Sequence, residues 1–122
     1  LSVGRSLYSM PPDHGAAAVR IVLCDPGLRA DWEGELDTMR ERMIRLWEKL
    51  AEALGRRSNS DRFDFIAGHR GMFSRLGLTV DQVRRLREEH AVYMVDDSRI
   101  NVAGLPEDRL DDLAMAIVSV AG

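Results

Sequence analysis

The sequence contains one cysteine, one lysine and no long apolar run. A lone cysteine, Cys24, excludes an internal disulfide and a cysteine-based zinc cluster. The longest apolar stretches are far shorter than the roughly 20 residues that a membrane-spanning helix needs. The chain carries 17 basic and 20 acidic side chains and a net charge of −3, which argues against a general nucleic-acid-binding protein. Because all the other basic residues are arginines, chemistry that needs a lysine must use Lys49 or come from outside this chain.

The length and composition are those of one folded domain. The 122 residues are 45% hydrophobic and 30% charged, which is too apolar for a disordered chain. The first residues, Leu1-Ser2-Val3-Gly4, lack the basic and apolar segments of a signal peptide. We therefore expect a cytoplasmic protein, and we expect this chain to be a fragment of a longer one.

One apolar stripe dominates the pattern of the chain. Its members are spaced by threes and fours, as one face of a helix requires: Leu28, Trp32, Leu36, Met39, Met43, Leu46, Trp47, Leu50 and Leu54. This spacing predicts a helix over about 29–55, ended by Gly55 and the polar run Arg56-Arg57-Ser58-Asn59-Ser60. At 1.5 Å per residue the helix would be about 40 Å long. Because a compact domain of this size does not need such a helix, we expect it to span two bodies or to pack against something outside this chain.

The remaining elements are short. Thr79 and Gln82 form the pattern of a capping box, which predicts the start of a helix. The expected order is a helix over 13–23 ended by Asp25-Pro26-Gly27, the long helix, a hairpin over 63–74 that turns at Gly68, a helix over 79–90, a hairpin of strands 92–95 and 99–102, and a helix from Pro106. This order predicts an α+β fold, with a small antiparallel sheet packed against helices.

No constellation of nucleophile, metal ligand or paired acid is found. His14, His69 and His90 are far apart, and none has a second ligand at metal-binding spacing. We expect Cys24 to be buried and inert because it ends an apolar run. The sequence therefore predicts no catalytic residue and no metal site in this chain.

Arg99 stands out among the arginines. It follows a predicted turn and begins a strand in otherwise apolar surroundings. A cation so placed either points outward or is held there to bind an anion, and the planar guanidinium suits a carboxylate. Arg5, in a loop near Tyr8 and Ser9, would be unremarkable alone.

Three stretches combine characteristic residues in a fixed order. They are Tyr8-Ser9-Met10-Pro11-Pro12-Asp13-His14-Gly15-Ala16, Gly71-Met72-Phe73-Ser74 with Gly77-Leu78, and Ser98-Arg99-Ile100-Asn101-Val102-Ala103-Gly104. Together they resemble the class I aminotransferases of the aspartate and aromatic amino acid branch. The resemblance covers nearly the whole chain and corresponds to about the last third of such an enzyme. It also identifies the long helix as the interdomain helix of the family.

The resemblance implies roles for four residues. Arg99 would bind the α-carboxylate of the substrate, and Phe73 would line the pocket beside it. Arg5 would reach from the neighbouring subunit to the distal carboxylate of a dicarboxylic substrate, and Ser9 belongs to the same intersubunit loop. The family members are homodimers with amino acid and 2-oxo acid substrates, and they hold pyridoxal phosphate on a lysine. In this reading, residues 1–27 are the end of the large domain and residues 28–122 are the small domain.

The chain also departs from the family pattern. The cofactor lysine and the other cofactor-binding residues lie upstream of Leu1, and Lys49 does not match that lysine. Ser98 stands where glycine is usual. Arg75-Leu76 stand where the family more usually has an aromatic residue followed by serine or threonine. We expect a fragment of an aromatic amino acid aminotransferase, inactive alone, without affinity for nucleic acid or membrane. Aspartate aminotransferase is one alternative, and a non-catalytic interaction module that pairs with a full-length chain is another.

Overall fold

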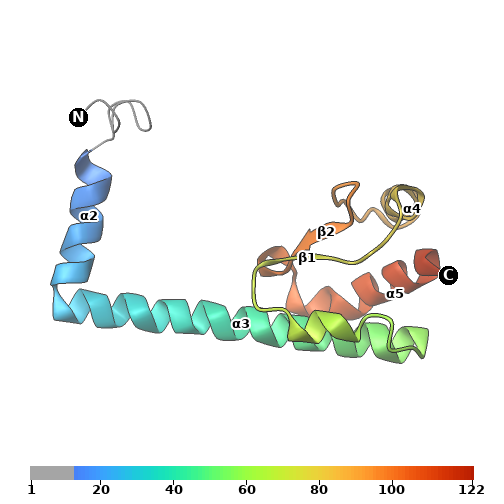
Figure 1. Ribbon diagram of the computed structural model, residues 1–122, viewed down its shortest axis with the longest axis horizontal. Helices are drawn as coiled ribbons and strands as arrows, with labels where there is room; N and C mark the ends of the chain where they lie inside the picture. The colour runs from blue at the N-terminus through green and yellow to red at the C-terminus, as the bar shows by residue number, and fades with distance from the viewer. Residues whose placement is uncertain (1–12) are drawn as a thin grey trace. The chain divides into compact units, whose positions relative to one another are not determined.

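The computed structural model describes residues 13–122, and it contains helices and a two-stranded antiparallel sheet, as the predicted α+β class requires (Figure 1). The elements in chain order are α2 (Asp13–Cys24), α3 (Pro26–Ser58), the 3₁₀ helix η1 (Asp64–Gly68), β1 (Phe73–Arg75), α4 (Val80–His90), β2 (Arg99–Asn101), the 3₁₀ helices η2 (Val102–Gly104) and η3 (Glu107–Arg109), and α5 (Leu110–Ala121). The chain divides into two compact units, and the boundary falls within α3, between Thr38 and Met39. The division into domains 1–27 and 28–122 stays a prediction.

The predicted break between the first two helices is confirmed. The Asp25 carboxylate accepts hydrogen bonds from the backbone N–H groups of Gly27 (2.8 Å) and Leu28 (3.0 Å), so it caps the start of α3. Pro26 occupies the first position of that helix, where its missing N–H costs nothing. The expectation that Cys24 is buried is wrong. Its thiol is exposed, and α2 has no buried residue.

Helix α3 is longer at its C-terminal end than the sequence predicts. Gly55 lies inside the helix, which continues to Ser58. Asn59 follows with a φ of 48°, a left-handed conformation that asparagine tolerates better than most residues. Arg56 and Arg57 occupy the last turn, where positive charge interacts favourably with the helix dipole. Arg56, Arg57 and Asn59 therefore determine where α3 ends, and Gly55 lies within its last turns.

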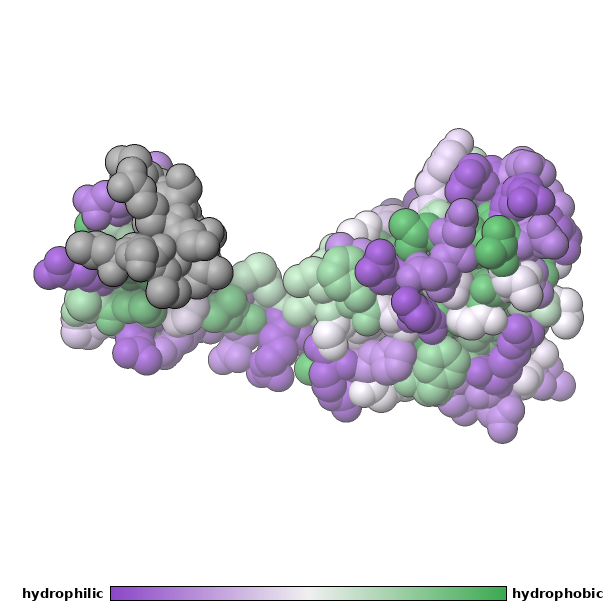
Figure 2. All heavy atoms as spheres, turned by 45° about the horizontal axis from the view of Figure 1, so that its top comes forward, coloured by the Kyte–Doolittle hydropathy of each residue, from purple (hydrophilic) through white to green (hydrophobic). Residues whose placement is uncertain are grey.

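The apolar stripe of α3 changes its surroundings along the helix. In the first unit Leu28, Trp32 and Leu36 are exposed. In the second unit Leu46, Trp47, Leu50 and Leu54 are fully buried. They form one core with residues of η1, α4, α5 and the inner face of the sheet. The surface over this core is mainly hydrophilic in Figure 2, with apolar side chains scattered between the charged ones.

The sheet pairs two strands that the sequence assigned to separate hairpins. β1 and β2 are antiparallel, with Phe73 opposite Asn101, Ser74 opposite Ile100 and Arg75 opposite Arg99. The predicted hairpins over 63–74 and 92–102 are therefore wrong. Both predictions paired neighbours in sequence, whereas the real partners are 24 to 28 residues apart, as the register shows.

The misassigned segments have a physical explanation. Phe63 and Ile66 are fully buried while Phe65 is exposed, which is a spacing of three and fits the 3₁₀ helix η1. Residues 92–95 do alternate, since Val92 and Met94 are half-buried between exposed neighbours. They form no strand, and within residues 13–122 the strand that pairs with β2 is β1.

Arg42 connects α3 with the segment that follows β2. Its Nη1 donates to the Ala103 carbonyl at 3.1 Å, and its Nη2 donates to the Leu105 carbonyl at 3.1 Å. A guanidinium presents its donors in a rigid fork, so the two bonds fix both distance and direction. The end of η2 is thereby attached to α3.

The capping box at the start of α4 is confirmed. Thr79 Oγ1 accepts from the Gln82 N–H at 3.3 Å, and Gln82 Oε1 accepts from the Thr79 N–H at 2.9 Å. Replacing Thr79 by alanine leaves one N–H of the first turn without its partner. We expect Thr79→Ala to lower the free energy of unfolding by about 1 kcal/mol.

Urea denaturation of the chain measures this effect. Thr38→Ala is the matched control, because Thr38 is exposed in the interior of α3 and its hydroxyl only donates back to the Gly34 carbonyl. Alanine has the higher helix propensity, so this control should be neutral or slightly stabilising. Equal losses in the two variants would contradict the capping role of Thr79.

Candidate functional site

The exposed face of the two-stranded sheet is the candidate site. In both strands the middle residue is buried and the outer two are exposed. Alternation along a strand therefore places Phe73, Arg75, Arg99 and Asn101 on one face. Arg75 and Arg99 are directly opposite each other, and Arg99 and Phe73 are diagonal neighbours.

Arg99 and Phe73 form a cation–π pair. The guanidinium carbon of Arg99 lies 5.9 Å from the centre of the Phe73 ring, within the range of this interaction. Phe73 is 56% exposed, so one side of the pair is open to a ligand. No acidic side chain within residues 13–122 forms an ion pair with Arg99. The pair therefore presents an oriented guanidinium that has no anionic partner of its own.

Asp97 pairs with one of the two opposed arginines. Its Oδ2 accepts from Arg75 Nη2 at 3.0 Å, and its Oδ1 accepts from the backbone N–H of Arg99 at 3.2 Å. Like charges directly opposite in a sheet are unfavourable, and the carboxylate offsets one of them. Asp97 therefore engages the Arg75 guanidinium and leaves that of Arg99 available.

The residue before Arg99 has an unusual backbone. Ser98 has a φ of 60°, in the left-handed region that glycine adopts without steric cost. The resembling family commonly has glycine at this position, and the left-handed backbone accounts for that preference. Serine retains the conformation here, and its side chain is buried.

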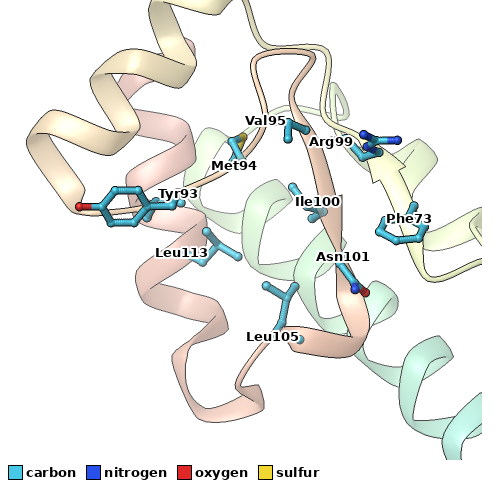
Figure 3. Close-up of a pocket in the computed structure, with 11 residues that line it drawn as sticks. Phe73, Tyr93, Met94, Val95, Arg99, Ile100, Asn101, Leu105 and Leu113 are labelled. Atoms are coloured by element: carbon cyan, nitrogen blue, oxygen red, sulfur yellow. The ribbon is translucent and has the colours of Figure 1, made fainter.

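A cavity of about 540 Å³ adjoins the strand that carries Arg99. Figure 3 shows Ile100, Leu105 and Leu113 turned toward one another on one side of β2, with Arg99 and Phe73 side by side on the other. The cavity is mostly apolar, and it is lined by Phe73, Val92, Tyr93, Met94, Val95, Arg99, Ile100, Asn101, Gly104, Leu105 and Leu113. An ionic group and an apolar surface thus lie next to each other.

The only lysine is engaged elsewhere. Lys49 Nζ donates to Glu107 Oε1 at 2.6 Å, and Arg45 lies 3.5 Å from the same oxygen. The hydrogen bond from Lys49 holds the pKa of the Glu107 carboxyl below its usual range. Lys49 is not among the residues that line the cavity beside Arg99.

The other side chains that could bind a metal ion are scattered over residues 13–122. In that range no three histidine, cysteine or acidic side chains are grouped so that they could hold a metal ion. His90 instead shares a hydrogen bond of 2.8 Å with the Ser119 hydroxyl, between α4 and α5. None of the helices of the same range combines the length and apolarity that crossing a bilayer requires.

Sequence reasoning identified two residues of this site and missed others. It named Arg99 and Phe73, which the structure brings together. The other two named residues, Arg5 and Ser9, lie outside the described residues. The turn before Arg99 was predicted, but the hydrogen bonds of Asp97 and the left-handed backbone of Ser98 were not.

Comparison with known proteins gives consistent matches. The model of the family "Aminotransferase class I and II" matches residues 1–117. The aromatic-amino-acid aminotransferase of Paracoccus denitrificans is 55% identical over 118 residues, which are 97% of this chain and 30% of that protein. The aspartate aminotransferase of Escherichia coli is 46% identical over 116 residues, which are 95% of this chain and 29% of that protein.

A solved structure has a similar fold. The aromatic-amino-acid aminotransferase from Burkholderia pseudomallei, covalently bound to pyridoxal phosphate, superposes with a TM-score of 0.89 at 47% identity. The match covers 97% of this chain and 30% of that one. This chain therefore spans less than a third of the length of the relatives that it matches.

Proposed function

Because this chain belongs to the class I and II aminotransferases, we propose that it supplies the carboxylate-binding part of an aromatic amino acid aminotransferase. The complete enzyme would move an amino group between an aromatic or dicarboxylic amino acid and a 2-oxo acid. The observation that carries the proposal is the Arg99–Phe73 pair on the open face of the sheet, where the guanidinium has no anionic partner among residues 13–122.

The chemistry of Arg99 fits the α-carboxylate. The fork of a guanidinium donates two parallel hydrogen bonds to the two oxygens of a carboxylate, which fixes orientation as well as position. The Phe73 ring lies beside the guanidinium, with 5.9 Å between the guanidinium carbon and the ring centre. Since every amino acid and every 2-oxo acid carries this carboxylate, one arginine serves both half-reactions.

The described residues do not fit pyridoxal phosphate. The cofactor needs an amine to hold it, and the only one on a side chain, Lys49 Nζ, is paired with Glu107. We therefore assign cofactor binding and proton transfer to residues outside this chain. The Burkholderia relative is covalently bound to the cofactor, which supports a dependence of the complete enzyme on pyridoxal phosphate.

The remaining parts of the proposal concern specificity and assembly. The name of the Paracoccus relative favours an aromatic substrate, and that of the Escherichia relative keeps aspartate as the alternative. We also propose a cytoplasmic homodimer, in which Arg5 and Ser9 of one subunit contribute to the substrate site of the other. Arg5 would bind the distal carboxylate of dicarboxylic substrates, as the resemblance implies.

An activity assay tests the function. The full-length polypeptide that contains this chain, supplied with pyridoxal phosphate, should transfer the amino group of phenylalanine, tyrosine and aspartate to 2-oxoglutarate. We expect the highest kcat/KM with an aromatic donor. Turnover of aspartate alone would support the aspartate aminotransferase alternative, and no transfer from any donor would contradict the proposal.

The 122-residue chain alone should form no specific adduct with pyridoxal phosphate. Lys49 is engaged in the ion pair with Glu107 and is not among the residues that line the cavity beside Arg99. We expect borohydride reduction of the mixture, followed by mass spectrometry, to find no saturable labelling of Lys49. Stoichiometric labelling there would overturn this prediction. Glu107→Gln is the informative control, because it removes the paired charge without creating a cofactor site.

A further inference from the structure

Ser98 is held at three points. Its Oγ accepts a hydrogen bond from the Gly77 N–H at 3.1 Å. Its backbone N–H donates to the Val95 carbonyl at 2.9 Å, and its carbonyl accepts from the Leu76 N–H at 3.1 Å. The residue is 1% exposed, so water does not reach these groups. Losing one of the bonds would therefore leave a buried polar group without a partner.

These bonds join two segments that are distant in sequence. Leu76 and Gly77 directly follow β1, and Ser98 directly precedes β2. Gly77 also has a left-handed backbone, with a φ of 73°. Two left-handed residues, one beside each strand, are thus connected through a hydroxyl and a backbone N–H.

The conformation of Ser98 requires such support. A non-glycine residue with a φ of 60° is uncommon and persists where the surrounding structure determines it. The backbone of Ser98 sets the direction in which the chain enters β2. It therefore sets the direction of the first residue of that strand, Arg99.

We propose that Ser98 is a positioning residue for Arg99. Its hydroxyl, through the bond to Gly77, fixes the start of β2 so that the Arg99 guanidinium stands over the Phe73 ring. The inference rests on the proposed function, since it assigns to Arg99 the binding of the substrate carboxylate. Two parallel hydrogen bonds to a carboxylate tolerate only small errors in the plane of the guanidinium. Ser98 acts on the substrate only through Arg99.

Asp97 also holds the start of β2, but it does not make the bond to Gly77 that Ser98 makes. Its carboxylate holds the Arg99 N–H and the Arg75 guanidinium, which fixes the charge around the site. It does not contact Gly77 in any hydrogen bond of the described residues, so the connection to the end of β1 beyond Arg75 depends on Ser98.

Two substitutions separate the hydroxyl from the backbone. Ser98→Ala removes the hydroxyl and keeps a side chain that is strained at positive φ. Ser98→Gly removes the hydroxyl and relieves the strain. Ser119→Ala is the matched control, because it deletes another serine hydroxyl with a partner, His90, away from β2.

The experiment uses the full-length enzyme with aromatic and dicarboxylic substrates. We expect both Ser98 variants to raise KM about 5-fold to 10-fold for every substrate, with kcat changed less than about twofold, since the carboxylate is bound alike in ground and transition states. Ser98→Ala should also lower Tm, whereas Ser98→Gly should have a Tm closer to that of the wild type. Ser119→Ala should leave KM unchanged.

Each other outcome has a defined meaning. Unchanged KM in both Ser98 variants, with Arg99→Lys impaired, would overturn the role of Ser98 and leave the proposed function intact. A raised KM in Ser98→Ala alone would assign the effect to backbone strain and overturn the role of the hydroxyl. A wild-type enzyme that transfers no amino group would overturn the proposed function, and this inference with it.

Discussion

Arg99→Lys is expected to lower kcat/KM of the full-length enzyme about 100-fold for every amino acid substrate, which corresponds to ~2.7 kcal/mol. Each charge-assisted hydrogen bond of a guanidinium to a carboxylate contributes about 1.5–3 kcal/mol. Lysine keeps the positive charge but loses the planar fork and its stacking on Phe73. All substrates share the α-carboxylate, so the loss should not depend on the side chain of the substrate.

Arg5→Leu is the contrasting variant in the same assay. If Arg5 binds the distal carboxylate, its loss should damage turnover of aspartate and glutamate far more than that of phenylalanine or tyrosine. An aromatic side chain offers no anion to that arginine. Steady-state kinetics with the four donors therefore separates the two arginines by their selectivity.

Arg70→Lys is the control for arginine replacement in general. Arg70 is exposed, and among residues 13–122 its guanidinium donates only to the backbone carbonyls of Ala67 and His69. It should leave the kinetics unchanged. The roles assigned to the two arginines would be wrong if Arg99→Lys spared all substrates, or if Arg5→Leu affected aromatic and dicarboxylic donors equally.

Trp47→Ala is expected to cost the 39–122 unit about 3–5 kcal/mol of unfolding free energy. The Trp47 side chain is fully buried in the core. Its indole N–H donates to the Gly71 carbonyl at 2.8 Å, and its ring packs edge-on against His69 at a centroid distance of 5.9 Å. The substitution removes a large apolar surface and leaves the carbonyl without its donor. Since a domain is stable by only about 5–15 kcal/mol, this single change threatens folding.

Two further variants keep this prediction testable. Trp47→Phe retains most of the buried ring and loses the hydrogen bond, so we expect a smaller loss of about 1–3 kcal/mol. Trp32→Ala is the matched control, because Trp32 is 41% exposed in the first unit. It should cost less than about 1 kcal/mol in urea denaturation of the same chain. A loss as large as that of Trp47→Ala would contradict the assignment of the core.

The helices could be predicted because their signals are local. The stripe of α3 and the capping box of α4 each lie within a short window of sequence. The end of α3 was less predictable: Gly55 is a common stop, but the last turn is favoured by Arg56 and Arg57 and closed by the left-handed Asn59. The signal that ends a helix is weaker than the one that defines its buried face.

The strands could not be predicted because their pairing is not local. Nothing near Phe73 indicates that its strand pairs with one more than twenty residues away. The alternation at 92–95 is real, but alternation reports burial and carries no information on pairing. Pairing was decided by the core, which buries Ile100 and Ser74 on the inner face of the sheet.

The candidate site was predictable in its residues and not in its geometry. The resemblance pointed to Arg99 and Phe73, and the diagonal relation between them follows only from the register of the sheet. The neutralisation of Arg75 by Asp97 also depends on that register. Serine itself does not indicate the left-handed backbone of Ser98, because it rarely adopts that conformation; the glycine that is usual here in the resembling family was the available signal.

The fork of Arg42 has a mechanical consequence. It attaches α3 to the two carbonyls that follow β2, and β2 begins with Arg99. The helix and the strand are thereby joined, because two hydrogen bonds from one planar guanidinium resist both sliding and twisting. Because Arg99 lies at the other end of this three-residue strand, a displacement of α3 at Arg42 would be transmitted to Arg99 through β2.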